Sequence, residues 1–128
     1  MILNENEAKV CLEYALKPIL KTNSVEIKES SLWIRDKIIL RAAILYQGNP
    51  LDLDAEFMLS YQNGKLCFEN IKGKVEYLFL QLKLMSVLKQ MIHDPRFIYQ
   101  DNACYYVFDL PIEHISVSEG YIEIELKK

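Results

Sequence analysis

The sequence predicts an α+β fold: a curved antiparallel sheet of about seven to nine strands, with two helices, at about 4–21 and 80–93, packed on one face. Three observations support this prediction: a hairpin whose two arms alternate strictly in polarity, several further hairpins of the same kind, and two apolar stripes with helical spacing. The 128 residues are 51% hydrophobic and 26% charged, which is typical of one globular domain, and we expect residues 1–128 to form it.

The hairpin lies between Leu51 and Glu69. From Leu51 to Gln62, apolar and polar residues alternate with a period of two, as in a strand with one face exposed to solvent. Asn63-Gly64 follows, and this dipeptide favours a type I′ turn because that turn needs positive φ at both central positions. The expected pairs bring the apolar faces of both arms together: Gln62 with Lys65, Tyr61 with Leu66, and Leu59 with Phe68.

A helix is predicted from Asn4 to about Lys21. Asn4 suits the N-cap, and Glu7 three residues later completes a capping box. Pro18 lacks an N–H and crowds the carbonyl group of the preceding turn, so we expect a kink there. The apolar stripe of this helix contains Ala8, Cys11, Leu12, Ala15, Leu16, Ile19 and Leu20.

A meander of strands is predicted between this helix and the hairpin. Val25–Lys28 alternates as a short strand, and segments 32–35 and 38–46 flank a two-residue turn at Asp36-Lys37. The second face of segment 38–46 is half apolar, which predicts a central strand covered on both sides.

The second helix is predicted after a break in the sheet pattern at residues 70–74. The stretch 75–92 is rich in Leu, Met, Lys and Gln, which favours helix from about Leu80, although Val75, Tyr77 and Phe79 are equally compatible with a short strand. His93-Asp94-Pro95 ends it.

Two hairpins are predicted to complete the chain. Segments 97–99 and 105–108 flank a turn at Asp101-Asn102. In the last hairpin, around Glu119-Gly120, Val117 faces Ile122 and Ile115 faces Ile124.

Charge and cysteine content restrict the class of protein. A net charge of −3 argues against nucleic acid and anionic membrane as electrostatic partners. Cys11, Cys67 and Cys104 have no metal-binding spacing and are expected to be buried free thiols. The first residues lack a signal-peptide pattern, and no run of about 18 uncharged apolar residues occurs. We therefore expect a cytoplasmic protein without a transmembrane segment.

Polar clusters give few candidates for chemistry. Asp52, Asp54 and Glu56 share one strand face and could hold a metal, but a solvated strand face predicts the same pattern. His114 is expected opposite Glu125, as a metal or general-base pair or as a surface cross-strand pair. No phosphate-binding or nucleophile motif occurs. We expect no catalytic residues, no metal and no cofactor.

The element order resembles one half of the tubular lipid-binding family, the fold of bactericidal/permeability-increasing protein and of synaptotagmin-like lipid-transfer modules. The resemblance lies in the alternating strands around Asn63-Gly64 and in the segment from Asp109-Leu110-Pro111-Ile112 to Ile122-Glu123-Ile124. It implies a non-enzymatic module with an apolar lipid groove. The first residues do not show the export signal that is usual in bacterial members, so we expect a difference from them in this respect.

The sequence thus predicts a module that binds a lipid or other apolar small molecule between sheet and helices. Two alternatives stay open: an interaction or assembly domain with a solid core, which could form a homodimer through a sheet edge, or a small cystatin-like or NTF2-like α+β enzyme with His114 and Glu125 in its cleft. The predicted apolar groove is lined by Phe57, Leu59, Leu66, Phe68, Leu84, Leu88 and Met91.

Overall fold

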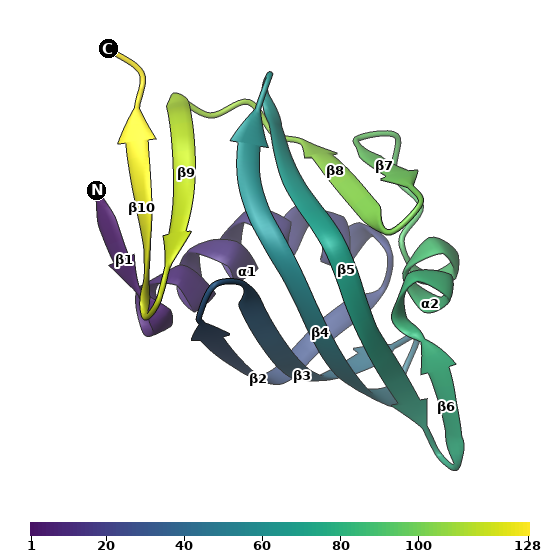
Figure 1. The fold of residues 1–128 in the computed structure, drawn as a ribbon. Helices are drawn as coiled ribbons and strands as arrows, with labels where there is room; N and C mark the ends of the chain where they lie inside the picture. The colour runs from purple at the N-terminus through teal and green to yellow at the C-terminus, as the bar shows by residue number, and fades with distance from the viewer.

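The computed structural model describes residues 1–128 and has the predicted α+β architecture, with ten strands and two helices. Six strands form the hydrogen-bonded order β2-β3-β4-β5-β8-β7, and β6 pairs with β5; a separate sheet has the order β1-β10-β9. Figure 1 shows α1 behind the curved seven-stranded sheet and α2 at its side. The bounds are β1 Ile2–Asn4, α1 Glu5–Thr22, β2 Val25–Ile34, β3 Ile38–Tyr46, β4 Asn49–Gln62, β5 Lys65–Tyr77, β6 Leu80–Lys83, α2 Leu84–Met91, β7 Phe97–Gln100, β8 Ala103–Val107, β9 Ile112–Ser118 and β10 Tyr121–Leu126.

The capping box of α1 is present as the sequence predicts. The Asn4 side chain accepts a hydrogen bond from the Glu7 N–H at 2.8 Å, and the Glu7 carboxylate accepts one from the Asn4 N–H at 3.0 Å. The helix continues through Pro18 to Thr22, whose hydroxyl donates to the Pro18 carbonyl oxygen. Cys11 is exposed, in contrast to the prediction that all three thiols are buried. It lies at the edge of the apolar stripe, which the sheet covers only in part.

The β4–β5 hairpin has the predicted register. Gln62 pairs with Lys65 and Leu59 with Phe68. Asn63 and Gly64 both have positive φ, at 52° and 74°, as a type I′ turn requires. Strand β5 continues through the predicted break, which is present as a bulge: its register with β4 shifts between Glu56 and Met58, opposite Asn70, whose φ is 52°. At Gly73, β5 passes so close to β4 that a Cβ atom would collide with the Asp54 carbonyl oxygen.

The β2–β3 connection is longer than predicted. Ile34 pairs with Ile38, so three residues form the loop instead of the two-residue turn at Asp36-Lys37. This register buries both isoleucines completely, and burial of that much apolar surface outweighs a tighter turn. Segments 25–28 and 32–35 merge into one strand, which ends at Ile34 and contains an irregularity between Ile27 and Glu29. The outer face of β3 stays partly exposed and is not covered as predicted.

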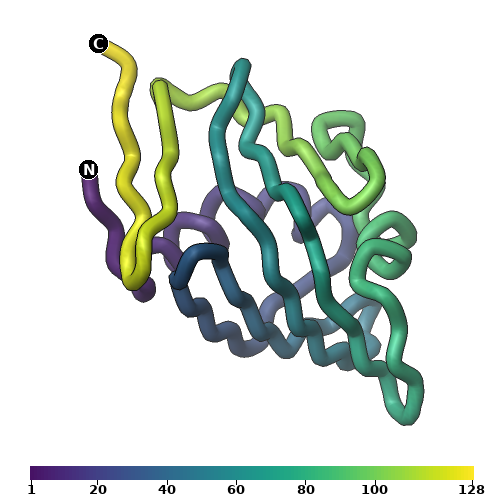
Figure 2. Tube along the Cα trace, in the orientation of Figure 1, coloured from purple at the N-terminus to yellow at the C-terminus, as the bar shows by residue number.

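The second helix begins four residues later than predicted. Residues 80–83 form β6, which pairs with β5 across a two-residue turn at Leu78-Phe79. Leucine-rich composition favoured helix over this segment, but the extension of β5 to Tyr77 offers backbone hydrogen-bond partners that local propensity does not reveal. Figure 2 shows this hairpin projecting from the body at the lower right.

Both ends of the chain belong to the small sheet. The β9–β10 hairpin has the predicted pairs, and β1, which the sequence did not predict, adds to β10. One apolar core of 27 buried residues includes side chains from both sheets and both helices. Part of the outer edge of β2 is blocked: the Ile34 N–H donates to the Glu5 carboxylate at 2.7 Å, and Lys9 donates to the Ser30 carbonyl oxygen.

Candidate apolar ligand site

An apolar cavity lies between the concave face of the sheet and the two helices. Its volume is about 140 Å³, and all 19 residues that line it are hydrophobic. Strands β2 to β5, β7 and β8 form one wall, and α1 and α2 with the adjoining Ile92 contribute the rest. The strand residues reach the cavity because alternation places every second side chain on the concave face.

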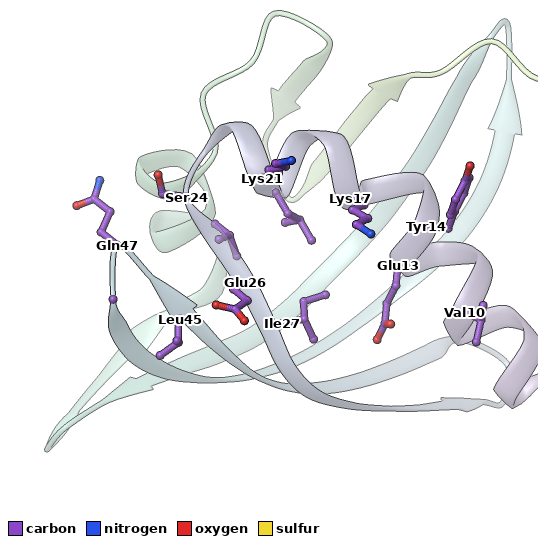
Figure 3. A pocket seen from close by; sticks show the side chains of 13 residues that line it. Val10, Glu13, Tyr14, Lys17, Lys21, Ser24, Glu26, Ile27, Leu45 and Gln47 are labelled. Atoms are coloured by element: carbon purple, nitrogen blue, oxygen red, sulfur yellow. The ribbon is translucent and has the colours of Figure 1, made fainter.

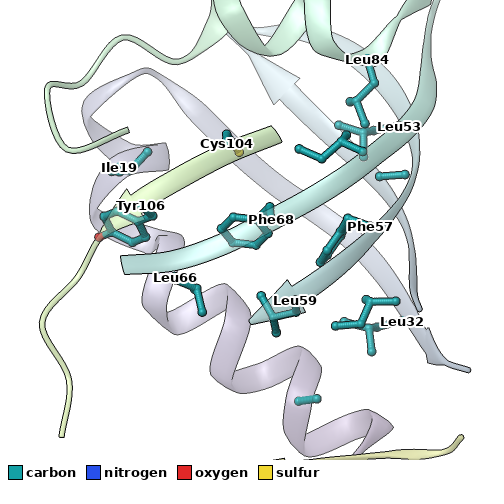
Figure 4. Close-up of a cluster of buried hydrophobic side chains, with 14 of the residues drawn as sticks. Ile19, Leu32, Leu53, Phe57, Leu59, Leu66, Phe68, Leu84, Cys104 and Tyr106 are labelled. Carbon is teal, nitrogen blue, oxygen red and sulfur yellow. The ribbon is translucent and has the colours of Figure 1, made fainter. Parts of the chain in front are cut away.

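Five of the seven predicted groove residues line this cavity. They are Phe57, Phe68, Leu84, Leu88 and Met91. The rings of Phe57 and Phe68 meet edge to face with centroids 5.4 Å apart. Leu59 and Leu66 are buried but lie outside the cavity, farther along β4 and β5 towards the turn (Figure 4).

The residues that sequence reasoning missed come mainly from α1 and from the first strands. Leu12, Leu16 and Leu20 line the cavity from α1 and are only partly buried, as expected for side chains that border unfilled space. The apolar stripe of α1 was the available signal, since it predicted which face meets the sheet. Cavity residues not assigned to the groove from sequence are Leu12, Leu16, Leu20, Val25, Ile27, Leu40, Ala42, Ile44, Leu53, Ala55, Ile71, Ile92, Phe97 and Cys104.

The one ionisable side chain in the cavity wall is the Cys104 thiol. Burial raises the pKa of Cys104 to about 12, so the thiol stays neutral near pH 7. The wall therefore carries no charge. Tyr99, next to the cavity residues of α2, directs its hydroxyl to the Leu88 and Ile92 carbonyl oxygens at 2.9 and 3.1 Å. It anchors the C-terminal end of α2 rather than offering a polar group to a ligand.

A wider groove adjoins the cavity between α1 and the edge of the sheet (Figure 3). It has a volume of about 740 Å³ and shares Leu20, Val25 and Ile27 with the cavity wall. Lys17 and Lys21 extend from α1 over this groove, and neither belongs to an ion pair. The shared residues show that the groove and the cavity adjoin.

The polar residues that the sequence offered as candidate metal or catalytic groups lie outside the cavity and the groove. Asp54 pairs with Arg41 at 3.4 Å and Glu56 with Lys37 at 2.8 Å on the exposed face of the sheet. His114 is opposite Glu125 in the predicted register, exposed and remote from both hollows. No group of three His, Cys, Asp or Glu side chains has the geometry to hold a metal ion.

His93 and Asp94, which follow the second helix, line neither the cavity nor the groove. The His93 ring contacts the Gln90 carbonyl oxygen at 2.7 Å, at the end of α2. Asp94 accepts hydrogen bonds from Arg96, which holds the pKa of this carboxyl below its usual value. Asp94 therefore stabilises the loop before β7.

Comparison of the chain with protein-family models, curated proteins and solved structures gives no match. Neither helix combines the length and apolar character that a membrane-crossing helix needs. The cavity and the groove beside it are therefore the features of the molecule that bear on function.

Proposed function

We propose that the protein binds a small amphiphile non-enzymatically, with the apolar tail in the cavity and a polar head in the groove. The observation that carries this proposal is the cavity of about 140 Å³ with a wholly hydrophobic wall. Protein interiors are normally packed without voids of this size, and apolar cavities stay dry and accept apolar molecules.

The cavity volume limits the tail. Engineered cavities of roughly 150 Å³ bind benzene, which has six carbon atoms. Binding sites for drug-sized ligands are larger, at roughly 300–1,000 Å³. A tail of about six carbon atoms is therefore the size that this cavity suits, and a longer chain must extend into the groove past Leu20 and Ile27.

The groove favours an anionic head. Lys17 and Lys21 lie one turn apart on α1, and their ammonium groups have no competing ion pair. Of the two groove acids, Glu26 is paired with Lys28 and Glu13 accepts a hydrogen bond from Ser30. A carboxylate head would thus find two cations without ion pairs, against one acid, Glu13, whose charge the neutral Ser30 hydroxyl does not cancel. The resemblance to tubular lipid-binding modules is a hypothesis that points to the same ligand class.

The test is a titration with hexanoate and with hexanol, read by calorimetry and by thermal melting. Ligand at ten times its Kd should stabilise the protein by about 1.4 kcal/mol through mass action. Leu88→Trp should abolish binding of both molecules because the indole fills the cavity. Lys17→Gln with Lys21→Gln should weaken hexanoate and leave hexanol unchanged.

Lys89→Trp is the matched control, since it places the same bulky side chain on the exposed side of α2. It should bind both molecules like the unmodified protein. If neither molecule binds and Leu88→Trp destabilises by about 1–3 kcal/mol, the cavity closes in solution. The interaction domain with a solid core then becomes the better description.

A further inference from the structure

We infer that the tip of the β5–β6 hairpin is a membrane-docking element that inserts into the interface of an anionic bilayer. The tip carries Leu78, Phe79, Leu80 and Leu82, which are 78%, 103%, 59% and 41% exposed. Leu78 and Phe79 form the two-residue turn itself. The hairpin projects from the body of the fold (Figures 1 and 2). Four apolar side chains close together on this projection form a larger apolar patch than isolated exposed residues do.

The backbone conformation of the turn is unfavourable for these residues, so the stability of the fold does not explain why they occur there. Leu78 has φ of 55°, which is unfavourable for a residue with a large side chain. The other five non-glycine residues with positive φ are Ser, Gln, Asn or Asp. Phe79 contacts nothing in the fold that would compensate, given its full exposure. The apolar pair therefore costs stability without contributing to the core.

From the turn towards the body of the protein, the side chains change from apolar to aromatic to cationic. Polarity rises in the same direction from the interior of a bilayer to its headgroups. Tyr77 and Leu80 pair next to the turn, and Lys74 and Lys83 pair three residues farther back, about 10 Å away at the rise of a strand. Interfacial elements typically bury their apolar parts about 5–10 Å deep, with Tyr and Lys at the headgroup level. Glu76 lies between them on the polar face, beside Gln81, and pairs with Lys74 at 3.3 Å.

The local charge favours an anionic surface despite the net charge of −3 on the chain. From Tyr77 to His93 the sequence contains Lys83 and Lys89 and no acidic residue. Positive side chains near an anionic bilayer each strengthen binding. The acidic residues that give the chain its net charge of −3 therefore lie outside residues 77–93.

A bilayer suits this tip better than a protein surface does. The tip is a convex projection of four exposed apolar side chains, too few to supply the roughly 800 Å² per partner of a stable protein interface. A bilayer accepts apolar side chains without a complementary pocket.

The experiment is co-sedimentation of the full chain with vesicles of phosphatidylcholine alone or mixed with phosphatidylserine. The unmodified protein should bind the mixed vesicles more tightly than the neutral ones. Leu78→Asn with Phe79→Gly should lower binding by at least about tenfold, because it removes the two most exposed apolar groups. Lys83→Gln should weaken binding to the mixed vesicles about fivefold and leave binding to the neutral ones unchanged.

Leu78→Asn relieves the positive φ at residue 78 and Phe79→Gly removes no packed contact, so the melting temperature of the double variant should be at least about that of the unmodified protein. Loss of binding then cannot be attributed to unfolding. Ile98→Thr, which removes an exposed apolar group from the separate β7–β8 hairpin, should bind vesicles like the unmodified protein. Absence of vesicle binding, equal binding by the variant with Leu78→Asn and Phe79→Gly, or a dimer that this variant abolishes would each overturn the proposal. The last result would assign the tip to a contact between copies of the chain.

Discussion

A two-residue turn lies at each end of strand β5, and the two turns differ in the polarity of their residues. At its first residue, Asn63-Gly64 connects it to β4, with positive φ at both positions and residues that accept it. At its last residue, Leu78-Phe79 connects it to β6. Leu78 has positive φ, and the Phe79 side chain is fully exposed. The two turns belong to one sheet and differ in whether local sequence and local structure agree.

The comparison distinguishes residues that determine the fold from residues that the fold exposes to solvent. The arms beside Asn63-Gly64 bury their apolar faces in the core, so turn and pattern favour one register. At Leu78-Phe79 the apolar side chains point into solvent, and local preferences conflict with the conformation. Such conflicts are expected where a site serves a purpose other than stability.

The largest expected effect tests the arms of the Asn63-Gly64 hairpin. Leu59→Asp should destabilise by about 4 kcal/mol or more, because Leu59 is buried and an aspartate there has no cationic partner. Ser60→Asp, one residue along on the opposite and partly exposed face, should cost no more than about 1 kcal/mol, because it loses the Ser60–Glu69 hydrogen bond and places a second carboxylate beside Glu69. Thermal or urea denaturation measures both. Small and equal losses would contradict the face assignment of β4.

The sequence predicts the fold best where turn chemistry and hydrophobic alternation coincide. The β4–β5, β7–β8 and β9–β10 hairpins have the predicted turns for this reason. The β2–β3 loop was predicted one residue too short, because Asp36-Lys37 is a weak turn signal and the burial of Ile34 and Ile38 decided the register. Strand β1 has no local signal, since its pairing with β10 joins the two ends of the chain.

The site was predictable in part for a related reason. Alternation identified Phe57 and Phe68, and the helical stripe identified Leu84, Leu88 and Met91. Neither pattern reveals where along a strand packing leaves space, so Leu59 and Leu66 were included although they lie in filled core. The contribution of Leu16 and Leu20 depends on how α1 crosses the sheet, which is a tertiary property.

A turn exchange at the first end of β5 should have the next largest effect. Asn63→Leu with Gly64→Phe puts two side chains at positive φ, where each costs about 1–2 kcal/mol. We expect a loss of about 2 kcal/mol or more, measured by urea denaturation. The long paired arms should keep the variant folded. A variant as stable as the unmodified protein would show that Leu-Phe suits such turns, and would remove the contrast between the two ends of β5.

The reciprocal exchange should have the smallest effect and the opposite sign. Leu78→Asn with Phe79→Gly relieves the positive φ at Leu78 and removes no buried contact of Phe79, which is fully exposed. The first term favours the variant, whereas the second is neutral and glycine at residue 79, whose φ is not positive, offsets part of the gain through the freedom of the unfolded chain. We expect a net gain of up to about 1 kcal/mol, or several degrees in Tm. Leu78→Asn alone should give at least this gain, because the unfavourable φ belongs to residue 78. A loss of stability in the single variant would mean that Leu78 makes an apolar contact worth more than its backbone cost, and the tip would then be part of the fold rather than a surface that the fold presents.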